Sequence, residues 1–303
     1  MSEQFLQSNG LKLAFDEFGN KTDPAIVLVM GLGSQMVQWP IDFCEALASS
    51  GYRVIRFDNR DIGLSEKVKV DKEVSILKVM AMKAVGLPVS VPYDLYDMAQ
   101  DAVGVLDALE IDRAHWVGVS MGGMIAQVVA AKYPNRCSTL TSIMSTTGNP
   151  KLPQASLKIR AQLLKRPPID DEAAYVEHML VTRKMISSPG FPITDEDMRA
   201  RTLLSYRRNI YPAGYRNQVV AIMATGDRRK LLKQIITPTL VIHGHDDPLV
   251  PVEGGIDTAR YISHSNLHLI EGMGHDLPPG LSPIMSNLIV EHIERQNASE
   301  KAA

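Results

Sequence analysis

The sequence predicts an α/β fold built around a mostly parallel central sheet flanked by helices. Short apolar runs alternate with helical patterns along most of the chain, which is typical of β-α-β units. Several of these runs are almost continuously apolar, as expected for strands that helices cover on both faces. The alternation stops once, at about residues 147–228, where helical patterns follow one another without a convincing strand. We therefore expect a sheet core formed by residues 1–146 and 229–303, with an all-helical cap inserted at 147–228.

An antiparallel pair of strands is expected to open the chain at residues 4–8 and 12–18. It would turn at Asn9-Gly10, a dipeptide that favours tight hairpins. The remaining strands are expected at residues 26–30, 53–57, 114–119, 140–145, 240–243 and 267–270, and the core helices at 42–49, 96–109, 121–132, 254–261 and 284–296. The expected cap helices cover residues 154–166, 171–186, 194–208 and 213–224, and a smaller insertion is expected at 66–92.

Composition excludes several classes of protein. The chain has 303 residues, of which 45% are hydrophobic and 22% charged, an ordinary globular mixture. The net charge is −2 with no block of like charges, so no nucleic-acid-binding surface is expected. Apolar runs such as residues 25–30 are far shorter than the roughly 20 residues that a membrane span requires.

The N-terminus and the cysteines favour a cytoplasmic protein. No basic stretch followed by an apolar one occurs at the N-terminus, so a secretory signal is not expected. Cys44 and Cys137 are too few for a disulfide framework and are expected to be reduced core thiols. No cluster of His, Cys and carboxylate residues has metal-ligand spacing, and no phosphate-binding loop is present, so neither a metal nor a cofactor is expected.

The motif that indicates chemistry is Gly118-Val119-Ser120-Met121-Gly122, which follows an apolar strand and opens an Ala-rich helix. On such a sharp turn the serine hydroxyl stands clear of the backbone, and the flanking glycines avoid a clash of Cβ atoms with neighbouring elements. The helix N-terminus behind the serine directs free N–H groups at any oxyanion formed there. Ser120 is therefore the candidate nucleophile.

A serine nucleophile needs a base, which in this architecture lies on a loop after a late strand. Of the eight histidines, only His275 lies on a loop directly after the last strand. Its neighbours Gly272 and Gly274 are expected to let that loop bring the imidazole inward. His243 and His245 have no candidate acid before them in the order Ser, then Asp or Glu, then His, that this architecture requires.

The acid that orients the base should follow an earlier strand. The loop after residues 240–243 offers two adjacent carboxylates, Asp246 and Asp247. We prefer Asp247, the third residue after Gly244 and directly before Pro248. Asp246 is the alternative, and its other role would be hydrogen bonding within the loop.

An oxyanion hole needs two N–H donors. Met121, the residue after the nucleophile, should supply one of them. Leu32 should supply the other, from the loop after residues 26–30. The glycines on either side, Gly31 and Gly33, would let this backbone approach the substrate and are candidate substrate-binding residues.

With these residues identified, the chain resembles the α/β-hydrolase superfamily along nearly its whole length. Matching stretches are VMGLG at 29–33, FDNRDIGLS at 57–65, the GVSMG motif, HGHDDPLVP at 243–251 and GH at 274–275. Met30-Gly31 in place of the usual His-Gly, with Trp39-Pro40 and Arg60-Asp61 nearby, is similar to the branch that contains aclacinomycin methylesterase. The resemblance implies a Ser/Asp/His triad, a helical cap, and ester hydrolysis without a metal or organic cofactor. Asp58 and Arg60 are expected to brace the loop beside the site.

The expected function is that of a serine esterase acting on a small-molecule ester. Methionines and leucines of the two insertions, among them Met80, Met82 and Met198, could line a pocket for a medium-sized hydrophobic ester. Carbon–carbon bond hydrolases, lactonases, thioesterases and perhydrolases use the same triad and stay open as alternatives. A non-catalytic ligand-binding receptor is the alternative of a different class, and the oligomeric state is left open.

Overall fold

The central sheet has the predicted, mostly parallel architecture. The computed structural model describes residues 3–70, 74–85, 87 and 89–302. Within them one sheet has the strand order β1-β2-β4-β3-β5-β6-β7-β8. The strands are β1 (Gln4–Ser8), β2 (Leu11–Phe18), β3 (Ala25–Val29), β4 (Arg53–Phe57), β5 (Ala114–Val119), β6 (Cys137–Ile143), β7 (Thr239–Gly244) and β8 (Ser265–Ile270). From β4 to β8 all neighbours pair in parallel, and β2 is antiparallel to both β1 and β4. The predicted fold class is confirmed.

The opening hairpin turns where the sequence predicts. Ser8 of β1 pairs with Leu11 of β2, which leaves Asn9 and Gly10 as the two loop residues. Their φ angles are 50° and 76°, both in the left-handed region that a two-residue hairpin turn of the favoured type requires. Asn and Gly tolerate this region better than other residues, which explains the choice of dipeptide.

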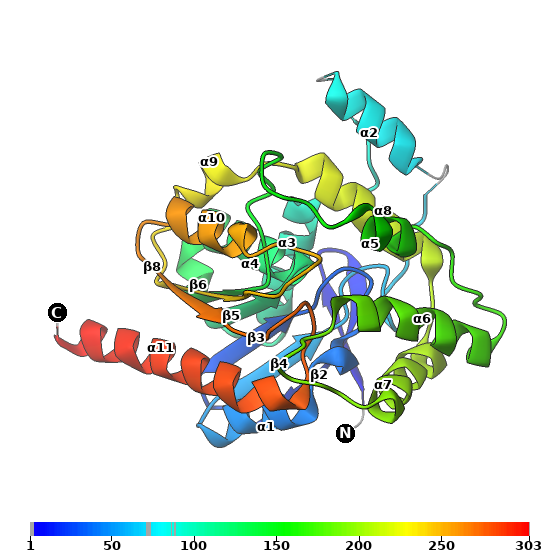
Figure 1. Ribbon diagram of the computed structural model, residues 1–303. Helices are drawn as coiled ribbons and strands as arrows, with labels where there is room; N and C mark the ends of the chain where they lie inside the picture. The colour runs from blue at the N-terminus through cyan, green and yellow to red at the C-terminus, as the bar shows by residue number, and fades with distance from the viewer. Residues whose placement is uncertain (1–2, 71–73, 86, 88, 303) are drawn as a thin grey trace.

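Helices cover both faces of the sheet (Figure 1). One face carries α3 (Leu95–Ala108), α4 (Met121–Lys132), α9 (Arg229–Leu232) and α10 (Glu253–Tyr261), and the other carries α1 (Ile41–Ser49) and α11 (Ser282–Ala302). Short 3₁₀ turns lie at η1 (Met36–Gln38), η2 (Pro134–Arg136) and η3 (Pro279–Leu281). Each face has its own hydrophobic core, and Trp116 of β5 lies in one while Phe43 of α1 lies in the other. Cys44 and Cys137 are both buried and free, and burial raises the pKa of each thiol to about 12.

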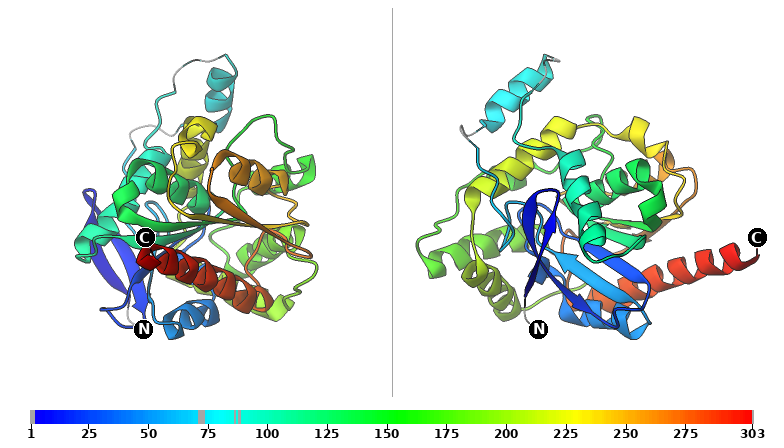
Figure 2. Two further views of the ribbon diagram at one scale, coloured as in Figure 1. Left: turned by 90° about the vertical axis from the view of Figure 1, so that its left-hand side faces the viewer. Right: turned by 180° about the vertical axis from the view of Figure 1, so that it is seen from behind.

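The helical insertion follows β6 and precedes β7, as predicted. It contains α5 (Leu157–Leu163), α6 (Glu172–Ile186), α7 (Asp195–Arg208) and α8 (Pro212–Thr225) and ends in α9. Figures 1 and 2 show α5, α6 and α7 together at one end of the sheet. Val176, Leu180 and Met198 form a small separate core between α6 and α7. Met198 therefore packs inside the insertion, in contrast to the pocket-lining position considered from the sequence.

A further helix, α2 (Ile76–Ala84), lies in the smaller insertion expected at 66–92, where the sequence analysis placed no helix. Ser75 caps its N-terminus by accepting a hydrogen bond from the Lys78 N–H. The helix projects from the rest of the molecule (Figures 1 and 2), and Met80 is 46% exposed on it. Met80 thus does not line an enclosed pocket in this arrangement. Residues 71–73, 86 and 88 of this insertion lie outside the described residues.

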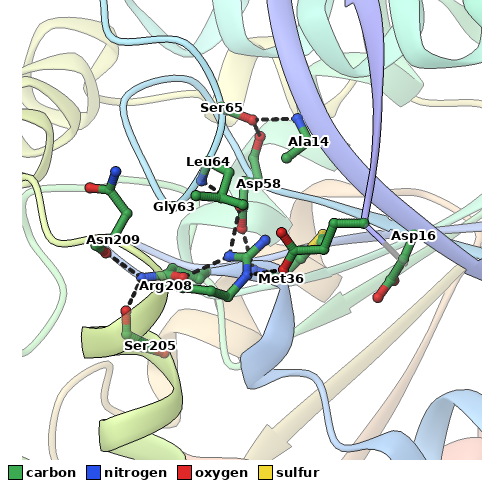
Figure 3. A network of polar contacts seen from close by, with 12 residues as sticks. Ala14, Asp16, Met36, Asp58, Gly63, Leu64, Ser65, Ser205, Arg208 and Asn209 are labelled. Atoms are coloured by element: carbon green, nitrogen blue, oxygen red, sulfur yellow. Dashed lines mark hydrogen bonds and ion pairs between the residues drawn. The ribbon is translucent and has the colours of Figure 1, made fainter. Parts of the chain in front are cut away.

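A buried ion pair joins the insertion to the sheet. The Asp58 carboxylate, directly after β4, accepts hydrogen bonds from the N–H groups of Met36 and Leu64 and pairs with Arg208 of α7 at 2.9 Å (Figure 3). Asp58 is fully buried, which raises the pKa of its carboxyl, while Arg208 acts in the opposite direction. Arg60, two residues later, forms a bidentate pair with Asp101 of α3 at 2.5 and 2.6 Å. Asp58 and Arg60 thus both brace the loop that follows β4, as expected.

Replacing Arg208 should destabilise the fold far more than replacing its neighbour. Arg208→Met leaves the buried Asp58 carboxylate without its counter-charge, which should lower the free energy of unfolding by about 3–5 kcal/mol. Arg207→Met is the matched control, because Arg207 pairs with Glu172 through side chains that are 66% and 40% exposed. Such an exposed pair should contribute less than about 1 kcal/mol.

Urea denaturation of both variants at neutral pH measures the difference. The deficit of Arg208→Met should shrink on acidification, because protonation of Asp58 removes the unpaired buried charge. Equal losses in the two variants would show that the Asp58–Arg208 pair does not stabilise the junction.

Candidate active site

Ser120 lies on the sharp turn between β5 and α4. Its φ and ψ angles are 54° and −118°, a conformation that residues other than glycine rarely adopt. The Ser120 N–H donates to the Ile143 carbonyl at 2.9 Å, and the Ser145 hydroxyl donates to the Ser120 carbonyl at 2.8 Å. The N–H and the carbonyl of Ser120 are therefore both hydrogen-bonded to β6 or to the residues after it, and these bonds stabilise the strained turn.

The two glycines of the motif allow backbones to approach each other, as the sequence predicts. A Cβ on Gly122 would lie 2.0 Å from the Val29 carbonyl oxygen of β3, and one on Gly118 would lie 2.2 Å from the Gly122 carbonyl oxygen. Both distances are far below van der Waals contact, and both neighbouring atoms belong to the backbone. Helix α4 can therefore begin this close to the sheet only when these positions lack a side chain.

The structure brings Ser120, His275 and Asp247 together. His275 Nε2 lies 3.0 Å from Ser120 Oγ, and His275 Nδ1 lies 2.6 Å from Asp247 Oδ2. Because a carboxylate only accepts hydrogen bonds, Nδ1 carries the proton and Nε2 is free to accept the serine proton. Asp247 and His275 are 5% and 9% exposed, so both hydrogen bonds lie largely out of water. Such an arrangement can activate a hydroxyl as a nucleophile.

The orientation of the Asp247 carboxylate is fixed by its own loop. Asp247 Oδ1 accepts hydrogen bonds from the N–H groups of Leu249 and Val250, at 2.9 and 2.8 Å, which leaves Oδ2 for His275. His243 supports the same turn, since its Nε2 lies 2.8 Å from the Val250 carbonyl oxygen and 3.6 Å from Asp247 Oδ2. Burial lowers the pKa of His243, which favours the neutral imidazole at this position. Nothing in the sequence indicates this supporting role of His243.

Asp246 points away from the imidazole. Its Oδ2 accepts a hydrogen bond from the Gly272 N–H at 2.9 Å, and its own N–H donates to the Met273 carbonyl at 3.1 Å. Asp246 thus connects its loop to the loop that carries His275, which is the alternative role considered for it from the sequence.

The two expected oxyanion donors belong to segments that lie close to Ser120 in the fold. Met121 is the first residue of α4, so its N–H has no acceptor within the helix. Leu32 belongs to the loop after β3, which passes close to the nucleophile: a Cβ on Gly31 would lie 3.3 Å from Ser120 Cβ. Gly31 therefore lets this loop pass close to the nucleophile, and its approach to a substrate stays a prediction.

Gly33 is engaged by the cap. Its N–H donates to Gln218 Oε1 of α8 at 2.9 Å, so this donor is already used in the described arrangement. The Gln218 side-chain nitrogen, Nε2, donates to the Arg60 carbonyl at 3.0 Å, and Gln218 is fully buried. A Cβ on Gly33 would lie 2.5 Å from the ring of Tyr215. Sequence reasoning missed Gln218 and Tyr215, because no local pattern relates a cap helix to a loop some 185 residues earlier.

The glycines beside His275 also have a packing role, which the sequence did not indicate. A Cβ on Gly274 would lie 2.6 Å from the Ser187 carbonyl oxygen, and one on Gly272 would lie 2.7 Å from the Cα of Gly190. They allow the segment between α6 and α7 to pack directly on the histidine loop. Gly272 also has a φ of 73°, a left-handed conformation that glycine adopts readily, so the conformational freedom expected for this loop is combined with close packing.

The described residues also bear on metal binding and on membrane spanning. Among the residues that the structure describes, no three His, Cys, Asp or Glu side chains come together in a way that could hold a metal ion. Across the same part of the chain, no helix combines the length and the apolar character needed to traverse a bilayer.

Known proteins with similar sequences are hydrolases. Rhodomycin D methylesterase DauP from Streptomyces sp. (strain C5) is 26% identical over 315 residues, covering 96% of this chain and 98% of that protein. A 2-hydroxy-6-oxononadienedioate/2-hydroxy-6-oxononatrienedioate hydrolase from Paraburkholderia xenovorans (strain LB400) is 28% identical, with 88% of this chain and 84% of that protein covered.

Solved structures share the fold. The enol-lactonase from Burkholderia xenovorans LB400 superposes with a TM-score of 0.73 at 20% identity, over 96% of this chain and 100% of that one. A thermophilic esterase from Thermogutta terrifontis gives a TM-score of 0.68 at 22% identity, over 98% and 99% of the two chains. The alpha/beta hydrolase fold family model matches residues 24–278, and with the sheet order and the helical insertion after β6 this shows that the chain belongs to the alpha/beta hydrolase fold family.

Proposed function

We propose that the protein is a serine hydrolase that cleaves carboxylic esters through an acyl-enzyme intermediate. The observation that carries this proposal is the continuous hydrogen-bonded chain from Ser120 Oγ through His275 to Asp247, with distances of 3.0 and 2.6 Å. The order of these residues in the sequence, Ser, then Asp, then His, is the order that this fold uses.

In the proposed cycle Ser120 Oγ attacks the ester carbonyl carbon while His275 Nε2 takes the hydroxyl proton. Asp247 holds the imidazole tautomer and stabilises the imidazolium that forms. The N–H groups of Leu32 and Met121 bind the oxyanion of the tetrahedral intermediate. The C–O bond to the alcohol breaks as His275 protonates the leaving oxygen, which leaves an acyl group on Ser120. Water then attacks the acyl carbon while His275 Nε2 takes its proton, and this proton passes to Ser120 Oγ as the bond between the acyl carbon and that oxygen breaks and the carboxylic acid leaves.

The relatives favour a methyl ester as the first substrate class to test. The rhodomycin D methylesterases DauP and DnrP match this chain over 96% of its length, at 26% and 25% identity. The dienedioate hydrolase from Paraburkholderia xenovorans and an enol-lactonase of Acinetobacter baylyi, each 28% identical over 88% of the chain, support a second candidate: the same triad acting on a 2-hydroxy-6-oxo acid or an enol lactone.

Replacing Ser120 with Ala should abolish turnover. The variant loses the nucleophile while the rest of the chain is unchanged, so kcat for p-nitrophenyl and methyl esters should fall by a factor on the order of 10⁶. A fluorophosphonate should label the wild-type protein at Ser120 and should leave the Ala variant unlabelled. Ester hydrolysis by Ser120→Ala at near wild-type rates would contradict the mechanism. Binding of esters by the wild type without turnover would indicate a receptor instead.

A substrate panel separates the two candidate reactions. Methyl esters of increasing acyl size are compared with a 2-hydroxy-6-oxo dienoic acid and an enol lactone, each with Ser120→Ala as the blank. The proposal predicts the highest kcat/KM for hydrophobic esters. A clear preference for the 2-hydroxy-6-oxo acid would favour the second candidate.

The two adjacent carboxylates of the loop after β7 should differ sharply in their effect on kcat. Asp247→Ala removes the group that holds the His275 tautomer and should lower kcat by a factor on the order of 10⁴. Asp246→Ala removes the side-chain bond to the Gly272 N–H but keeps the backbone bond to the Met273 carbonyl, so it should lower kcat far less than Asp247→Ala does. Steady-state hydrolysis of one p-nitrophenyl ester by both variants measures the contrast. Larger loss in Asp246→Ala than in Asp247→Ala would reverse the assignment of the acid.

A further inference from the structure

A short segment of the cap lies directly against the loop that carries His275. We call residues 186–190, which connect α6 to α7, the cap segment, and residues 272–276 the histidine loop. The His275 N–H donates to the Ile186 carbonyl at 2.7 Å, and the Gly190 N–H donates to the Gly272 carbonyl at 2.9 Å. The cap segment therefore binds the main chain of the histidine loop at its beginning and at His275 itself.

Ser188 bridges the two residues that flank His275. Its hydroxyl accepts a hydrogen bond from the Gly274 N–H at 2.8 Å and donates to Asp276 Oδ1 at 2.5 Å. Its own N–H donates to the same oxygen of Asp276 at 3.0 Å. Ser188 is 2% exposed, so water cannot easily replace these partners. One serine thus fixes the chain immediately before and immediately after the imidazole-bearing residue.

The contact is too close to be incidental. A Cβ on Gly274 would lie 2.6 Å from the Ser187 carbonyl oxygen. Gly190 and Gly272 are so close that a side chain on either one would collide with the backbone of the other. The opposite side of the histidine loop is held by Asp246, through Gly272 and Met273. The histidine loop is therefore clamped between the acid loop of the core and the cap segment.

We infer that Ser188 and Asp276 are positioning residues that hold His275 in register with both Ser120 and Asp247; the inference rests on the proposed function. The imidazole has to keep two hydrogen bonds at opposite ends of its ring, and a small displacement of its main chain breaks at least one of them. Neither Ser188 nor Asp276 touches the reacting atoms, so both act through the backbone of the histidine loop.

Ser188→Ala and Asp276→Ala test the inference. Each should lower kcat by about 10- to 100-fold, because misplacement of a catalytic group by about 1 Å can cost on the order of 10² in rate. KM should change little, since ester binding does not involve these groups. The rate of fluorophosphonate labelling of Ser120 should fall by a similar factor, because that reaction also needs His275 as the base.

Conservative and control variants separate positioning from general damage. Asp276→Asn keeps an oxygen that can accept both hydrogen bonds from Ser188 and should restore most of kcat. Asp195→Asn is the matched control, because the exposed pair of Asp195 with Lys184 joins the same helices, α6 and α7, at the surface. It should leave kcat unchanged. Thermal denaturation of every variant identifies any that are not folded at the assay temperature; if Asp276→Ala is among them, Ser188→Ala carries the test.

Three results would overturn the inference: wild-type kcat in Ser188→Ala, a loss in Asp276→Ala that Asp276→Asn does not restore, or an equal loss in Asp195→Asn. With Ser120→Ala inactive, any of these leaves the proposed function standing. Full activity of Ser120→Ala would instead remove the proposed function itself.

Discussion

The hydrogen bond between the Asp247 carboxylate and His275 Nδ1 is the interaction on which the proposed chemistry of this molecule depends. At 2.6 Å and largely shielded from water, it decides which ring nitrogen carries the proton and where the imidazole points. The carboxylate can serve in this way because two backbone N–H groups of its own turn occupy its other oxygen. A free carboxylate could rotate, and the imidazole would then have no fixed partner.

The cap has a second role besides covering the carboxyl ends of the strands. Its bonds to the core include those of Gln218 to the loop after β3, of Arg208 to Asp58, and of the cap segment to the histidine loop. Each joint pairs buried polar groups, and separating one leaves them unsatisfied at a cost of about 1–3 kcal/mol or more per group. Lifting the whole cap as a rigid body would break all three joints, whereas a local change within it need not. The cap thus helps to hold in place the loop after β3 and the histidine loop, which carry candidate catalytic groups.

The sequence predicts the sheet well, and it locates three candidate residues that the structure brings together, because both depend on local order. Alternating apolar runs locate the strands, the glycines around Ser120 reveal a tight turn, and His275 is the one histidine directly after the last strand. The sequence does not reveal Gln218 or Ser188, whose partners lie 185 and 88 residues away. Their roles depend on how the cap packs on the core. The local sequence around a polar residue does not indicate which distant loop that residue will contact.

Asp246 and Asp247 show where local reasoning ends. Both are carboxylates on one turn, so the sequence could favour Asp247 only by its position after Gly244 and before Pro248. Their directions are set by which N–H groups lie within reach: the turn after Pro248 offers two to Asp247, and the histidine loop offers the Gly272 N–H to Asp246. These hydrogen bonds therefore orient Asp247 toward the imidazole and Asp246 toward the loop that carries His275. Exchanging their roles would require rebuilding both loops, because the backbone donors that orient each carboxylate belong to different segments of the chain.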